Sequence, residues 1–90
     1  MEAERAGATG TVTAMIGVVL NAKFPDNSTP EIYNAIEIPI DDHGGRLVAE
    51  VQQHLGNGLV KAVAMSTTEG LRRGLPARDT GAPIAVPVWP

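Results

Sequence analysis

The chain reads RLVAEVQQHLGNGLVKAVAM between residues 46 and 65. Apolar residues occupy every second position from Leu47 to Val51, which predicts a strand over Arg46–Leu55 with one buried face. The Gly-Asn-Gly triplet at 56–58 supplies residues that tolerate positive φ, as tight hairpin turns demand. Leu59–Met65 then follows as the partner strand. This stretch predicts a β-hairpin, and it makes a β fold the starting point for the rest of the chain.

Shorter strand signals lie on both sides of this hairpin. The strands that they predict are Thr11–Ile16, Val18–Phe24, Ala35–Ile40 and Pro83–Val88. The first two are also compatible with one long strand bent at Gly17. Pro39 implies that its strand lies at an edge or carries a bulge, because proline has no amide hydrogen to donate. Residues 66–81 show no alternation, and residues 68–74 within them allow a turn or two of helix between glycines.

Composition favours an all-β fold in a single domain. Ten glycines and seven prolines in 90 residues imply many tight turns, and therefore short strands rather than long helices. The aromatic residues are Phe24, Tyr33 and Trp89, so aliphatic side chains must fill the core. Six short strands with little helix predict a small closed six-stranded β-barrel, because closure removes exposed strand edges. A two-sheet sandwich is the alternative.

Charge and cysteine content exclude several classes of function. Seven basic and ten acidic side chains give a net charge of −3, which argues against nucleic-acid binding. The chain has no cysteine, so it has neither disulfides nor a thiolate zinc site. The longest mainly apolar stretch, Val12–Ala22, is shorter than the ~20 residues of a transmembrane helix. Direct membrane insertion is not expected.

The sequence also lacks the motifs of the common catalytic and cofactor sites, so we predict no catalytic, cofactor-binding or metal residues. A phosphate-binding P-loop needs Gly-x-x-x-x-Gly-Lys-Ser/Thr, and neither Lys23 nor Lys61 follows a glycine. The triplet at 56–58 lacks the third glycine and the helix of a dinucleotide fingerprint. The residues at 41–43, Asp-Asp-His, are adjacent in a turn and fit a solvated hairpin better than a metal site. His54 has no serine or cysteine partner nearby in the sequence.

Charged residues near the end of the chain are the candidates for recognition. Arg72, Arg73 and Arg78 form a basic trio that could hold a phosphate or an acidic partner. Glu69 and Asp79 interrupt it and no aromatic residue accompanies it, so a solvated or protein-contacting face is favoured over nucleic acid.

Four segments of the chain resemble the opening of F-type ATP synthase beta subunits. They are Gly10–Pro25, with Gly17 between two apolar strands and Phe24 at the end; Pro30–Glu37; Leu47–Gly74, which includes Thr68-Glu69-Gly70-Leu71-Arg72-Arg73-Gly74; and Asp79–Val88. Their order and spacing agree with that family from residue 9 to residue 88. The departures are Asn21, where the family usually has Asp, and Lys61, where it usually has Arg.

The resemblance implies that residues 10–88 form the N-terminal β-barrel of that subunit. Residues 1–9 are then a loose N-terminal segment, and residues 89–90 are the point where a linker to the nucleotide-binding domain would start. In that family, barrels of alpha and beta subunits alternate in a crown that holds the hexamer together. We therefore expect an assembly module with alpha-type partners, and Glu69, Arg72 and Arg73 as interface candidates.

By the same resemblance, the complex is peripheral, on the cytoplasmic side of an energy-transducing membrane. The parent subunit binds ATP or ADP with magnesium and catalyses ATP synthesis coupled to proton transport, whereas this chain alone is expected to be neither an enzyme nor a nucleotide binder. The alternative is a free-standing small barrel that acts as a binding module or as a competitor of ring assembly.

Overall fold

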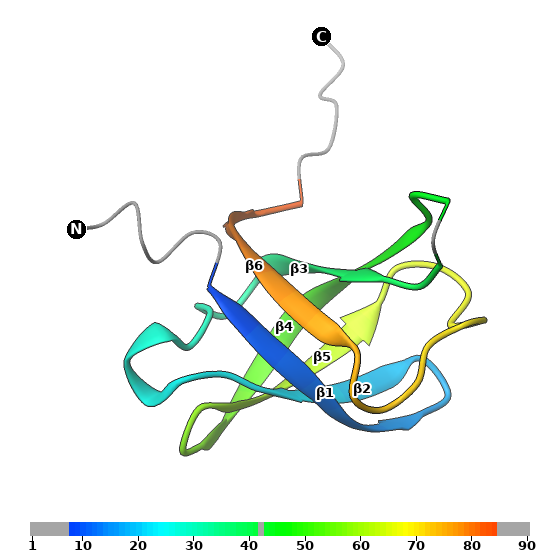
Figure 1. The fold of residues 1–90 in the computed structure, drawn as a ribbon. Helices are drawn as coiled ribbons and strands as arrows, with labels where there is room; N and C mark the ends of the chain where they lie inside the picture. The colour runs from blue at the N-terminus through cyan, green and yellow to red at the C-terminus, as the bar shows by residue number, and fades with distance from the viewer. Residues whose placement is uncertain (1–7, 42, 85–90) are drawn as a thin grey trace, which may run out of the picture.

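Six antiparallel strands close into a barrel in the computed structural model, which describes residues 8–41 and 43–84 (Figure 1). The elements are β1 Thr9–Ile16, β2 Val19–Lys23, the short 3₁₀ helix η2 Asp26–Ser28, β3 Asn34–Pro39, β4 Arg46–Gly56, β5 Leu59–Ala64 and β6 Pro76–Pro83. Around the barrel the strands follow the order β1-β2-β5-β4-β3-β6, and β6 pairs with β1 to complete the circle. The closed barrel is confirmed, and the sandwich alternative is wrong.

Two hairpins form where the turn residues predict them. Gly17, with φ of 58°, opens the turn between β1 and β2, so residues 11–24 form two strands rather than one bent strand. In the second hairpin, between β4 and β5, Gly56, Asn57 and Gly58 have φ values of 98°, 57° and 82°. These left-handed conformations turn the chain back sharply, and glycine and asparagine adopt them at least cost.

The core consists of the inward-facing residues of alternating strand positions. Leu20, Ala22 and Phe24 are buried along one side of β2 and its end, as the alternation predicts. The other buried hydrophobic side chains of the core cluster are Val12, Ile36, Ile38, Leu47, Ala49, Val51, Val60, Ala62, Ala64 and Ala77. Aliphatic residues dominate this set, as the scarcity of aromatic residues in the sequence predicts.

The last strand differs from its prediction. β6 runs over Pro76–Pro83 and pairs with both β1 and β3, whereas the sequence predicted the last strand over Pro83–Val88 and no strand within residues 66–81. Residues 85–88 lie outside the described residues. The inward positions of β6 include Ala77 and the polar Asp79, which gave no apolar alternation to detect. The helical turn allowed at 68–74 is absent from these described residues, which form turns instead.

Pro39 also departs from its predicted setting. It is the last residue of β3 and lies opposite Arg46 of β4, so it ends a ladder in a barrel without edge strands.

All neighbouring strands run antiparallel, and this fixes where the connections lie. The β1–β2, β3–β4 and β5–β6 connections occupy one end of the barrel, whereas the start of β1 and the end of β6 lie at the other (Figure 1). Glu69, Arg72 and Arg73 lie in the β5–β6 loop and therefore belong to the end of the barrel that is away from Thr9 and Pro83, whereas Arg78 of β6 lies opposite Thr9.

Candidate interaction surface

The β5–β6 loop, residues 65–75, is fixed to the barrel at both of its ends. The amide of Met65 donates a hydrogen bond to the Val48 carbonyl at 2.9 Å. At the other end, the Gly74 amide donates to the Val12 carbonyl at 2.8 Å, and the Val12 amide donates to the Leu75 carbonyl at 2.9 Å. Both flanks of the loop thus bond to neighbouring strands, although the loop itself is not a strand.

Two leucines hold the loop against the core of the barrel. Leu71 and Leu75 are partly buried and pack against the core cluster. The Leu71 amide also donates to the Thr68 carbonyl at 2.9 Å, which closes a turn just before the arginine pair. Gly70 and Gly74 have φ values of 89° and 91°, so both turns need a glycine, as their setting in the sequence suggested. The loop is therefore an ordered platform rather than a loose connection.

Glu69, Arg72 and Arg73 project from this platform into solvent. All three residues are exposed. Among the residues that the structure describes, none of their charged groups forms an ion pair. Their predicted location in an exposed irregular segment is confirmed, and their role in a contact with another protein stays a prediction.

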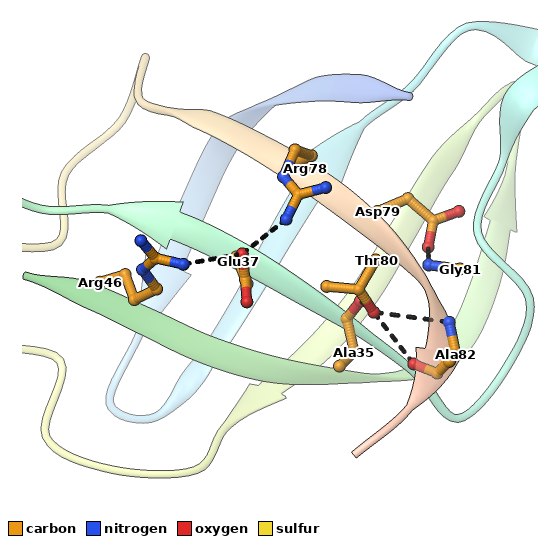
Figure 2. A network of polar contacts seen from close by, with 8 residues as sticks. All are labelled: Ala35, Glu37, Arg46, Arg78, Asp79, Thr80, Gly81 and Ala82. Atoms are coloured by element: carbon orange, nitrogen blue, oxygen red, sulfur yellow. Dashed lines mark hydrogen bonds and ion pairs between the residues drawn. The ribbon is translucent and has the colours of Figure 1, made fainter. Parts of the chain in front are cut away.

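Arg78 differs from Arg72 and Arg73, the other members of the basic trio, because it forms an ion pair. Arg78 on β6 donates to Glu37 Oε1 on β3 at 2.8 Å, and Arg46 on β4 donates to the same oxygen at 3.4 Å (Figure 2). The two arginine side chains are more than half exposed, so these pairs contribute little to stability. Within the trio, Arg72 and Arg73 keep guanidinium groups that pair with no carboxylate among the described residues.

The Glu37 ion pairs line an open hollow of about 380 Å³. Asp41 also lines this hollow, so its lining carries the carboxylates of Glu37 and Asp41 and the guanidinium groups of Arg46 and Arg78. With these charges balanced, the hollow has no excess charge that would select an anion or a cation. In the turn beside this hollow, Asp41 Oδ1 accepts hydrogen bonds from the amides of His43 at 2.7 Å and Gly45 at 2.9 Å. This confirms the predicted turn; Asp42 lies outside the described residues.

Asp79 is a buried acidic residue that the sequence did not identify. Its side chain is fully buried, and Oδ1 accepts hydrogen bonds from the Gly81 amide at 2.8 Å and from Asn34 Nδ2 at 3.4 Å. Its Oδ2 has no partner among the described residues. The neighbouring Thr80 donates its hydroxyl to the Ala35 carbonyl at 2.8 Å (Figure 2). These bonds connect β6 to β3 where their register shifts, so the role of Asp79 is structural.

His54 likewise has a structural contact. Its Nε2 lies 2.6 Å from the Pro30 carbonyl oxygen, which ties β4 to the segment before β3. No group of three or more potential metal ligands occurs in residues 8–41 and 43–84. In the same residues, no helix has the length and apolarity needed to cross a membrane.

The comparison with protein families agrees with this geometry. Residues 12–81 match the model of the ATP synthase alpha/beta family, beta-barrel domain. The chain belongs to the ATP synthase alpha/beta family. The match begins in β1 and ends in β6, so it includes the whole β5–β6 loop with Glu69, Arg72 and Arg73.

Asn21 and Lys61, the two positions where the sequence departs from the beta-subunit pattern, are neighbours in the barrel. Asn21 and Lys61 lie directly opposite each other on β2 and β5 of this ATP synthase alpha/beta domain. They therefore form one cross-strand pair, an amide facing an ammonium group, on the outer side of the barrel.

Proposed function

We propose that the chain is the barrel of a beta-type subunit and serves as an assembly module of the ATP synthase. In this role it packs beside alpha-type barrels in an alternating ring and holds that ring together. The family match and the closed barrel support an assembly domain, and the resemblance of residues 68–74 and 79–88 to beta subunits supports the beta type.

The observation that carries the proposal is the pair of free guanidinium groups on an anchored loop. Arg72 and Arg73 are exposed and lack ion-pair partners among the described residues, while Leu71 beneath them is packed on the core. A rigid loop that presents unpaired charge loses little conformational entropy on binding, which favours protein recognition over simple solvation. An acidic surface of an alpha-type barrel is the partner that this charge requires.

Catalysis and location follow from the same proposal. The 90 residues contain no P-loop motif, so ATP or ADP with magnesium would be bound elsewhere in the parent subunit. The parent complex would be peripheral, on the cytoplasmic side of an energy-transducing membrane.

Binding to a recombinant alpha-subunit N-terminal barrel tests the proposal. In isothermal titration calorimetry the wild-type chain is expected to bind, and the Arg72→Glu/Arg73→Glu variant is expected to bind at least about ten-fold more weakly, since the reversal turns attraction into repulsion. Lys23→Glu/Arg46→Glu is the control, because it changes the net charge equally at two other exposed sites. Unchanged melting by circular dichroism shows that each variant is folded.

The outcomes separate the parts of the proposal. If the wild-type chain does not bind the alpha-type barrel, the assembly function is wrong. If the wild type binds and the loop variant binds no worse than the control, the function stands and the assignment of Arg72 and Arg73 to the interface is wrong.

A further inference from the structure

A second surface, outside the β5–β6 loop, lies on the outer side of β1, β2, β5 and β4. A hollow of about 400 Å³ opens there, and we call it the lysine hollow. Its lining includes Ala14, Ile16, Asn21, Gln53, Leu55 and Lys61. Leu20 of the core cluster and Met15, which packs against it, also line the hollow. Asn21 and Lys61, however, alternate with buried residues along β2 and β5, so their side chains lie on the outer side of the barrel.

The centre of the lysine hollow is one cross-strand row. Ala14 pairs with Asn21, Asn21 pairs with Lys61, and Lys61 pairs with Gln53. Directly paired residues on one face of a sheet are the closest side-chain neighbours that it provides. Lys61 therefore has an amide on each side, and amides do not neutralise an ammonium charge.

Lys61 has no ion-pair partner among the described residues. The acidic residue nearest in register is Glu50, which lies opposite Val63, and it accepts a hydrogen bond from Gln52 at 2.6 Å. As a residue, Lys61 is neither buried nor fully exposed. An unpaired ammonium group can form a charge-assisted hydrogen bond with a carboxylate brought by another molecule.

Apolar side chains flank this charge. Ile16 is 80% exposed and Leu55 is 42% exposed, and both line the hollow. Exposed aliphatic side chains around a single charged group match the composition of a protein contact rather than that of a small-anion site, which would collect several donors.

We infer that the lysine hollow docks an acidic residue, flanked by apolar side chains, of a neighbouring alpha-type barrel. This inference rests on the proposed function. A symmetric contact with a second copy would place the same patch on both sides and bring two Lys61 ammonium groups together. That repulsion disfavours self-association through this face and selects a partner with a different, acidic surface.

The test uses the 90-residue chain and the recombinant alpha-subunit N-terminal barrel. Lys61→Gln is expected to weaken binding at least about ten-fold, Lys61→Arg is expected to retain it, and Ile16→Ser is expected to weaken it. Lys23→Gln is the matched control, because it removes the same charge from β2 outside the hollow, where Lys23 donates to the Asn57 carbonyl at 2.5 Å. The control is expected to stay within about two-fold of wild type.

Three results would overturn the inference. If the wild type binds and Lys61→Gln binds as well as Lys23→Gln, the hollow is not the docking site, while the proposed function survives. If the wild type does not bind at all, the proposed function fails and this inference fails with it. If sedimentation shows that the wild-type chain dimerises and that Ile16→Ser abolishes the dimer, the occupant is a second copy.

Discussion

Two glycines of one hairpin turn separate backbone strain from steric overlap. Gly56 and Gly58 both have positive φ, at 98° and 82°, but their surroundings differ. A Cβ atom added at Gly56 would meet no atom within 4 Å. One added at Gly58 would overlap the Phe24 carbonyl oxygen and lie 3.3 Å from Asp26 Oδ1. Gly56→Ala therefore measures backbone strain alone, whereas Gly58→Ala measures backbone strain and steric overlap together.

Gly56→Ala is expected to cost only the left-handed backbone conformation, about 1–2 kcal/mol. Gly58→Ala has the same cost, and it also forces the turn away from the end of β2. That movement stretches the hydrogen bond from the Phe24 amide to the Gly58 carbonyl, now 2.8 Å, which is worth about 1 kcal/mol. It also loosens the packing of Phe24, which is 1% exposed, for about 1–2 kcal/mol more. The expected total is about 3–5 kcal/mol.

Urea unfolding followed by far-ultraviolet circular dichroism measures both free energies. A domain of this size has a total stability of about 5–13 kcal/mol, so Gly58→Ala removes a large part of it. The melting temperature is expected to fall by about 5–15 °C for Gly56→Ala and by at least about 15 °C for Gly58→Ala. If Gly58→Ala does not fold while Gly56→Ala does, the result also agrees with a larger loss of stability at Gly58. A difference of less than about 1 kcal/mol between the variants would refute the close approach of the turn to β2.

Two further predictions concern stability. Gly70→Val and Gly74→Val are each expected to destabilise the domain by about 1–3 kcal/mol, because a β-branched residue is strained at φ values of 89° and 91°; unchanged thermal melting of both would contradict this. Asp79→Ala is expected to cost about 1–3 kcal/mol more than Asp79→Asn in urea unfolding, because alanine leaves the Gly81 amide and the Asn34 side chain without their acceptor, whereas asparagine keeps it. Equal unfolding free energies for these two variants would show that the acceptor is not needed.

Local sequence was sufficient for much of the fold. The strand alternation from Leu47 to Val51 and the Gly-Asn-Gly turn predicted the β4–β5 hairpin, because side-chain period and positive φ are properties of neighbouring residues. Turn frequency and short strands likewise predicted a closed barrel. The exposed position of Arg72 and Arg73 could also be read locally, because glycines bound their segment.

Tertiary structure alone decided where β6 lies and which surface charges stay unpaired. β6 is a strand because β1 and β3 offer their backbone groups on either side of it, and its buried Asp79 removed the apolar period that would have predicted it. Arg78 loses its free charge only because strand order places Glu37 beside it. The unpaired state of Lys61 likewise depends on Asn21, which the pairing of β2 with β5 brings alongside, in addition to Gln53, its neighbour across the β4–β5 hairpin. Charge pairing is a property of neighbours in space, so the sequence determined which charges exist and the fold determined which of them stay free.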